Sequence, residues 1–373
     1  MDKKFKKIIM LLLTITLSFI CLACDKNAGA PSNPSEPSIP STPSNPSEPS
    51  IPSTPSNPSE PSNPEVSVHV HAFAQLAGNQ SILFCSECNG YLVKGVNSEY
   101  LEVDENPQTL EYVLSDENVQ PINGKMNFII SGSVEYDATY TISSVTYVYN
   151  LNKSDSSEVN ISGCGTNPEL TLVTGDTTYA DGAEFRAGYQ EGGIPTAKIS
   201  MVGIKLNDTR NTSTSHYTLT NTEFTCDELY LEDCTFTNCI DFSEGTKITI
   251  KNCVFDFQVS SRYSVWVGYV GANPSGAAHD RVESCIIQNC TFNNTKRGIK
   301  ILTSGANIII EENTFVGLTE KPAIVLDSTN VELNTVLIKN NTFTDCTKGS
   351  WNSLDNSNYN EPYNTDCFAV TEQ

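Results

Sequence analysis

The chain has 373 residues, of which 44 are acidic and 22 are basic, so its formal net charge at pH 7 is −22. Nucleic acids are held mainly by basic groups, and this acidity therefore argues against a nucleic-acid partner. It is compatible with calcium, with basic partners or with solubility alone, so charge does not select a function.

The first 23 residues have the layout of a signal peptide. Four lysines precede an apolar run from Ile8 to Ala23, and Cys24 follows directly. The run is shorter than the ~20 residues that cross a bilayer as a helix. This end resembles that of bacterial lipoproteins, which implies removal of residues 1–23 and acylation of Cys24. Cys21 stands where such proteins usually have leucine, which leaves ordinary secretory cleavage as the alternative.

Residues 24–64 are expected to form a stalk. From Pro31 to Pro64 every third residue is proline, in the tripeptide Pro-Ser-x. Regular prolines favour polyproline II at about 3.1 Å per residue, so this disordered, semi-rigid spacer would reach roughly 100 Å. Recognition by a peptide-binding domain is the alternative. With a lipid as the only membrane attachment, we expect an extracytoplasmic protein at the bacterial envelope or surface.

Residues 65–97 contain His69-Val-His71 and the knuckle Cys85-Ser-Glu-Cys88. Alternate residues of a strand share a face, and a Cys-x-x-Cys turn presents two sulfur ligands to one centre. The segment resembles a zinc ribbon or zinc knuckle, which implies a small β module with structural zinc on these four residues. A Cys85–Cys88 disulfide, or a reduced pair with exposed histidines, is the alternative.

Residues 98–373 carry an internal repeat of the form apolar-x-apolar-x-x-(Cys/Asn)-x-Phe. Its five copies begin 19, 37, 23 and 28 residues apart, which suits one turn of a β-solenoid with loops of varied length. We expect the sixth position to form a buried ladder in which cysteine acts as a small packing residue rather than a metal ligand. The ladder residues are Cys234, Cys253, Cys290, Asn313 and Asn341.

These repeats, with a short capping helix expected at Leu110–Leu114, resemble the pectate-lyase-like family of right-handed parallel β-helices. The resemblance covers about 250 residues and implies an all-β solenoid. It does not select a chemistry, because this fold carries both enzymes and adhesins. In enzymes of the family, the sheet before the repeated strand forms a polysaccharide groove, which corresponds here to residues 263–269, 298–302 and 323–327.

Strand alternation in these segments turns five residues outward: Ser264, Trp266, Gly268, Lys300 and Val325. Trp266 would then offer a stacking surface for a sugar ring. Its expected aromatic neighbours are Tyr263 and Tyr269, and the basic groups that would hold a uronate or sulfate are Arg262, Arg297 and Lys300. The alternative is an indole packed under a loop and basic residues that serve the protein's own carboxylates.

Catalytic residues are harder to assemble from the sequence. The carboxylate motifs of glycosidases with this fold are missing from the sequence, and Asp327 is the acidic residue that we place on the groove. A lyase would need calcium and a base, for which the candidates are Arg262, His279, Arg297, Lys300 and Asp327.

We therefore expect a surface-anchored, non-catalytic protein that binds glycans or other surfaces. A polysaccharide lyase and a purely structural envelope protein are the alternatives.

Overall fold

A computed structural model describes residues 70–137, 140–142, 146–151, 156–173, 182–187, 197–208, 221–242, 245–257, 263–268, 282–303, 305–318, 320, 322–326, 335–346 and 350–352. The expected signal peptide, the lipidation site Cys24 and the stalk lie outside these residues. Within the described ranges the chain is built from strands, with one short helix, α2 (Leu110–Ser115). No helix in this part of the protein is long and apolar enough to span a membrane.

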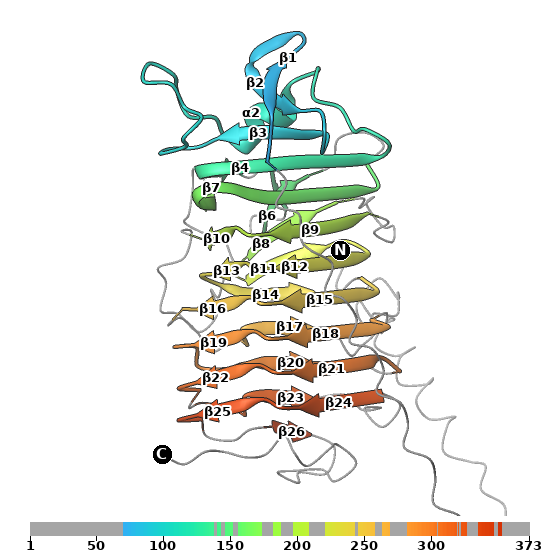
Figure 1. Cartoon of the computed structure of the whole chain (residues 1–373). Coiled ribbons are helices and arrows are strands. Elements are labelled where there is room, and N and C mark those ends of the chain that lie inside the picture. Colours follow the sequence, from blue (N-terminus) through green and yellow to red (C-terminus); the bar gives the residue numbers. More distant parts are fainter. Residues whose placement is uncertain are drawn as a thin grey trace, which may run out of the picture. The chain divides into compact units, whose positions relative to one another are not determined.

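Successive turns of the chain stack as rungs of a parallel solenoid (Figure 1). The strands form three faces, and on each face the strands of neighbouring rungs pair in parallel. The first face consists of β3 (Gly90–Lys94), β4 (Lys125–Asp137), β7 (Glu158–Val173), β9 (Lys198–Val202), β12 (Glu228–Glu232), β15 (Lys247–Lys251), β18 (Ser284–Gln288), β21 (Asn307–Glu311) and β24 (Thr335–Lys339).

The second face begins with the second halves of the long strands β4 and β7. It continues through β10 (Lys205–Asp208), β13 (Thr235–Phe236), β16 (Val254–Asp256), β19 (Thr291–Asn293), β22 (Thr314–Val316) and β25 (Thr342–Thr344).

The third face forms a separate sheet, which starts with the antiparallel pair β5 (Tyr140–Ile142) and β6 (Thr146–Asn150). Its parallel part continues through β8 (Gly182–Arg186), β11 (Asn221–Thr225), β14 (Cys239–Phe242), β17 (Val265–Val267), β20 (Ile299–Ile301), β23 (Ile324–Leu326) and β26 (Ser350–Asn352).

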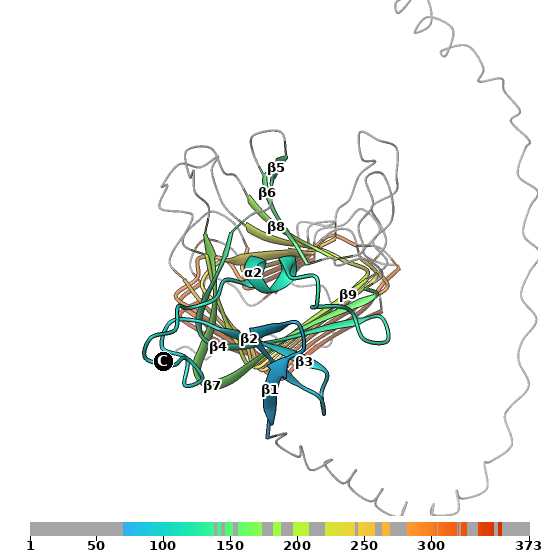
Figure 2. The same cartoon turned by 90° about the horizontal axis from the view of Figure 1, so that it is seen from above.

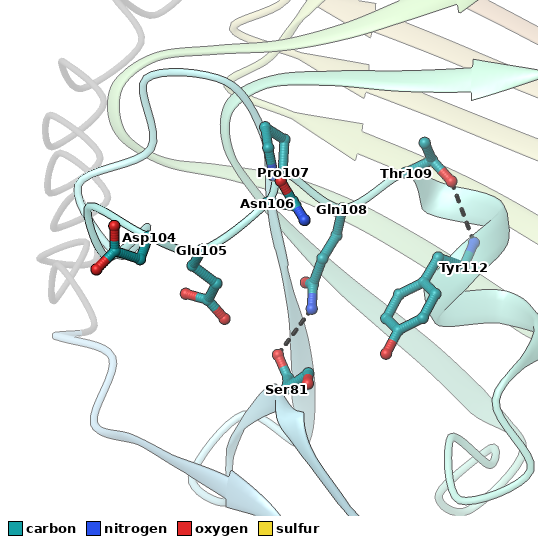
Figure 3. A pocket seen from close by; sticks show the side chains of 8 residues that line it. All are labelled: Ser81, Asp104, Glu105, Asn106, Pro107, Gln108, Thr109 and Tyr112. Carbon is teal, nitrogen blue, oxygen red and sulfur yellow. Dashed lines mark hydrogen bonds between the residues drawn. The ribbon is translucent and has the colours of Figure 1, made fainter.

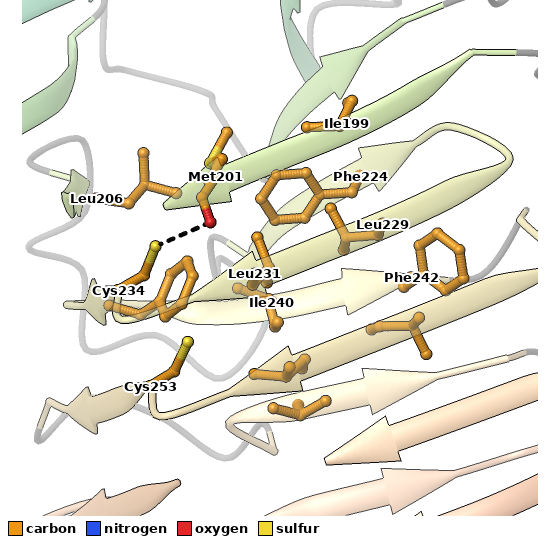
Figure 4. Packing of buried hydrophobic residues seen from close by; sticks show 14 of the residues in the cluster. Ile199, Met201, Leu206, Phe224, Leu229, Leu231, Cys234, Ile240, Phe242 and Cys253 are labelled. Atoms are coloured by element: carbon orange, nitrogen blue, oxygen red, sulfur yellow. Dashed lines mark hydrogen bonds between the residues drawn. The ribbon is translucent and has the colours of Figure 1, made fainter. Parts of the chain in front are cut away.

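The core follows from alternation along these short strands. In β12 the second and fourth residues, Leu229 and Leu231, are buried, and the same positions are buried in β15, β18 and β21. Figure 4 shows such side chains from different strands, among them Ile199 and Ile240, pointing into one interior. Burial of each large aliphatic side chain contributes about 1.5–3 kcal/mol, so the free energy of folding is spread along the stack.

The phenylalanine of the repeat forms a continuous column inside the solenoid. Consecutive ring centroids lie 5.0, 4.9, 4.7 and 5.2 Å apart, and the interplanar angles do not exceed 15°. All members of the column are at most 1% exposed: Phe236, Phe255, Phe292, Phe315 and Phe343.

The bend between the first and second faces uses a left-handed residue directly before each ladder position. These residues have φ between 52° and 60°, and four of the five are Asn or Asp, which tolerate that conformation. They are Asp233, Asn252, Asn289, Glu312 and Asn340. The backbone therefore turns one residue before the ladder position.

The N-terminal end of the solenoid is closed by the short hairpin of β1 (Phe73–Leu76) and β2 (Asn79–Cys85) and by α2. Strand β3 pairs antiparallel with β2 and parallel with β4, so the predicted small module continues into the first rung without a break in the sheet. The helix lies over the end of the solenoid (Figure 2), with Leu110 and Val113 buried and Thr109 as its N-cap. Its position confirms the expected capping helix.

Candidate functional site

The third face carries a row of outward positions that are in register from rung to rung. In β17 and β20, Val265, Val267, Ile299 and Ile301 are at most 1% exposed, so the intervening residues face outward. Parallel pairing spaces these positions by about 4.8 Å. In rung order they are Glu223, Asp241, Trp266, Lys300 and Val325.

Trp266 and Lys300 are joined in this row. The Lys300 Nζ atom lies 4.7 Å from the centroid of the Trp266 ring, and the indole Nε1 donates to the Gly268 carbonyl at 3.1 Å. A cation over an indole face stabilises the pair by about 0.5–1 kcal/mol at an exposed site. The contact gives this point of the sheet an aromatic surface and a positive charge at adjacent positions.

Tyr263 contacts both members of this pair. It is 6% exposed, its ring meets Trp266 edge-on at 6.1 Å, and Lys300 Nζ lies 5.7 Å from its centroid. Ser264 and Val325 were expected to face solvent, but both are fully buried, and Ser264 Oγ donates to the Arg297 carbonyl at 2.8 Å. Because Tyr263 is nearly buried, the exposed aromatic surface at Trp266 is smaller than the sequence indicated.

Arg297 belongs to an ion-pair cluster. Its Nε lies 3.3 Å from Glu320, whose other carboxylate oxygen lies 2.9 Å from Lys296 Nζ. Burial opposes ionisation of Glu320, but the hydrogen bond and charge of Lys296, with the charge of Arg297, hold its pKa below the usual value. For Arg297, the geometry favours the alternative in which a basic residue serves the protein's own carboxylate.

Two acidic residues on this row were missed by the sequence analysis. Glu223 and Asp241 pair in register with each other, and Asp241 pairs with Trp266. The sequence placed Asp327 on this face, and the structure adds Glu223 and Asp241. Inward Ile240 and Phe242 flank Asp241 in the sequence and give the alternation that could have placed it.

Several predicted site residues lie outside the described ranges. They are His69, Arg262, Tyr269, His279 and Asp327.

The ladder residues of the repeat stand at equivalent places in successive rungs and are at most 6% exposed. Asn341 Oδ1 accepts from the Asn313 backbone N–H at 3.0 Å, and Asn313 Oδ1 accepts from the Cys290 N–H at 2.9 Å. A hydrogen bond to Cys253, together with burial, raises the pKa of Cys234 well above its usual value. The thiol therefore stays protonated, as suits a packing role.

At the knuckle, the structure brings together three of the four predicted zinc ligands, His71, Cys85 and Cys88. Neither cysteine belongs to a disulfide, and their side chains are hydrogen-bonded to each other.

A pocket of about 550 Å³ lies beside α2 (Figure 3), and Ser81, Gln108 and Tyr112 are among its lining residues. Gln108 Nε2 donates to the Ser81 carbonyl at 2.7 Å, and Glu105 in the wall pairs with buried Lys94. A neighbouring pocket of about 780 Å³ shares part of this wall. Neither pocket is lined by a residue that the sequence singled out for binding or catalysis.

Residues 197–366 match the family model for a right handed beta helix region. Comparison with curated proteins and with solved structures gave no match. The match spans the rungs from β9 onward, where the described strands pair in parallel on all three faces. It confirms the expected fold class. The described chain is therefore an all-β parallel solenoid, and residues 197–366 are similar to the right-handed β-helix family.

Proposed function

We propose that this chain is a surface-anchored lipoprotein whose β-helix binds anionic glycans without turning them over. The observation that carries the proposal is the Lys300 ammonium held 4.7 Å from the Trp266 ring centroid on the outward row of the third face. An indole face packs against the C–H groups of a sugar ring. An adjacent ammonium attracts a carboxylate or sulfate on the same sugar.

The rigidity of the sheet supports this function. Trp266 and Lys300 are held by strands that pair with neighbours on both sides, β14 before and β23 after. A binding group fixed on a strand loses little conformational freedom when the ligand arrives.

The charge along the row gives the ligand an orientation. Asp241 and Glu223 lie on the side of Trp266 opposite to Lys300. We therefore expect the anionic group at the Lys300 end and sugar hydroxyls, which can donate to carboxylates, at the acidic end.

In this proposal a lipid on Cys24 anchors the chain, and the proline-rich residues 31–64 separate the solenoid from the membrane. A semi-rigid spacer of roughly 100 Å would hold the solenoid clear of the envelope and present the third face to soluble or cell-bound glycans.

The test is retention of the full chain, in detergent micelles, on a panel of neutral, uronate-containing and sulfated polysaccharides. We expect Trp266→Ala to weaken retention about tenfold, the equivalent of 1.4 kcal/mol, and Lys300→Gln to remove the preference for anionic over neutral glycans. The matched controls are Tyr230→Ala and Lys251→Gln, which change half-buried residues on the first face. Unchanged retention by Trp266→Ala would rule out this site.

A calcium-dependent uronate lyase is the second candidate, and the stacked carboxylates of Glu223 and Asp241 favour it. Carboxylates are ligands that Ca²⁺ prefers. The same wells are therefore read for the ultraviolet absorbance of unsaturated product, with and without a calcium chelator. Product that disappears on chelation would replace the binding proposal with a lyase. The absence of both retention and product would favour a structural envelope protein.

A further inference from the structure

We propose that His71, Cys85 and Cys88 bind one Zn²⁺ ion and that this ion fastens the β1–β2 hairpin to the first rungs of the solenoid. The site lies at the N-terminal end of the β-helix and is independent of the proposed glycan surface.

The geometry of the three side chains suits a single ion. Their ligand atoms all lie within 4.8 Å of one another, and Cys88 Sγ is 3.6 Å from His71 Nδ1. Zinc takes sulfur at about 2.3 Å and nitrogen at about 2.0–2.1 Å, so tetrahedral ligands around it lie roughly 3.5–3.8 Å apart. The sulfur–nitrogen distance already falls in this range.

The local fold brings the ligands together from two directions. His71 precedes β1, in which Phe73 pairs with Cys85 at the end of β2. A tight turn then carries Cys88, passes through left-handed Asn89 and enters β3 at Gly90. A Cβ atom on Gly90 would lie 3.1 Å from Cys88 Sγ and 2.5 Å from Ile129, so glycine leaves room for the sulfur.

Neighbouring groups hold the three ligand residues in place. Asn127 Nδ2 on β4 donates to the Cys88 carbonyl at 2.8 Å, and Asn160 Nδ2 on β7 donates to Asn127 Oδ1 at 2.8 Å. The His71 ring stacks on Phe73 with centroids 5.4 Å apart, and Cys85 is fully buried. Outer groups of this kind orient metal ligands and raise metal affinity.

The donor set selects the class of metal. Two thiolates and an imidazole are soft or borderline ligands, which suit Zn²⁺, whereas Ca²⁺ and Mg²⁺ require oxygen ligands. Cys88 lies in a turn that is tied to β4, whereas Cys85 ends β2 of the hairpin and His71 precedes β1. An ion shared by them would therefore join the hairpin to the solenoid, and its binding energy would stabilise the cap.

The first experiment measures Zn²⁺ bound to the reduced full chain by elemental analysis and by competition with a chromogenic chelator. We expect one Zn²⁺ per chain and at least a hundredfold loss of affinity in Cys88→Ser and in His71→Gln. The control is Cys164→Ser, which removes a half-buried free cysteine outside the cluster and should leave affinity unchanged. Equal binding by Cys88→Ser and the wild type, or a Cys85–Cys88 disulfide in the purified chain, would overturn the proposal.

Two measurements on the wild type do not depend on the folding of a variant. Co²⁺ in place of Zn²⁺ should give thiolate-to-cobalt charge-transfer absorbance, and its absence contradicts thiolate ligation. Hydrogen exchange with Zn²⁺, compared with exchange in a chelator, should show protection confined to β1, β2 and β3. Unchanged exchange in the hairpin would show that the ion does not fasten the cap.

Discussion

The asparagine ladder offers the sharpest test of what stabilises the solenoid. Asn313 is 1% exposed; its Oδ1 accepts from the Cys290 N–H at 2.9 Å, and its Nδ2 donates to the Ile287 carbonyl at 2.9 Å. Asn313→Ala removes both side-chain partners from buried backbone groups. Each buried group left unsatisfied costs about 1–3 kcal/mol, so we expect a loss of about 2–4 kcal/mol in the free energy of unfolding.

Two further variants separate hydrogen bonding from packing. Asn313→Cys recreates the earlier rungs, where the Cys253 sulfur takes a hydrogen bond from the Cys234 backbone. Because sulfur is a weak acceptor, this variant should lose only about 1 kcal/mol. Asn307→Ala is the matched control, since Asn307 is exposed at the start of the same strand, β21, and should stay within about 0.5 kcal/mol of the wild type.

Urea unfolding followed by far-ultraviolet circular dichroism gives these differences. Because a stack of rungs can unfold in parts, the variants are compared only where the dependence on urea has the same slope. A loss below about 0.5 kcal/mol for Asn313→Ala, or equal losses for Asn313→Ala and Asn307→Ala, would refute the reasoning.

Three other outcomes can be measured by denaturation. Phe292→Ala should lower the free energy of unfolding by about 3–5 kcal/mol, which is about 1 kcal/mol more than Phe343→Ala. The reason is that Phe292 stacks on two rings of the column and Phe343 on one. Equal losses would show that ring stacking does not contribute. Asn289→Val should destabilise by at least about 1 kcal/mol and Asn289→Gly by much less, since φ at this bend is 53°; a tolerated valine would contradict the left-handed turn. Burial raises the pKa of Glu111 to about 7, so the neutral carboxyl favours the folded state. The melting temperature should therefore fall as the pH rises from about 4.5 to 7, and Glu111→Gln should remove that fall. A variant with the same pH profile as the wild type would contradict this role of Glu111.

The repeat was readable from the sequence because in-register parallel stacking copies one rung onto the next. Equivalent residues such as Phe255 and Phe292 occupy the same position in successive copies and meet in space. The third face was harder to place in the early rungs. Its strands β8, β11 and β14 lie outside the five copies of the repeat, so Glu223 and Asp241 were not placed.

Exposure was the other quantity that alternation did not give. The strand pattern placed Val325 on the outer side of β23, in register with Lys300, yet its side chain is fully buried. Alternation determines the side of a sheet to which a residue points, but not which other groups cover that side.

Charged residues are arranged differently on the outer surfaces of the first and third faces, and this difference indicates where a ligand would bind. On the first face, in-register positions alternate in sign through five rungs: Lys125, Glu158, Lys198, Glu228 and Lys247. Ion pairs join three of the four steps. Exposed pairs add little stability, but a pairing that skipped one rung would oppose like charges, so this ladder favours the observed order of the rungs.

The row on the third face does not follow that pattern. Glu223 and Asp241 place carboxylates in adjacent rungs, and Trp266 and Lys300 follow them directly. Like charges that face each other across strands disfavour folding, and an outward indole gains less from burial than an inward one. The first face alternates charge from rung to rung, whereas the third face places like charges in adjacent rungs at Glu223 and Asp241. At this one place the sequence works against folding. Such conflicts are expected at functional sites, which is independent support for ligand binding at the third face.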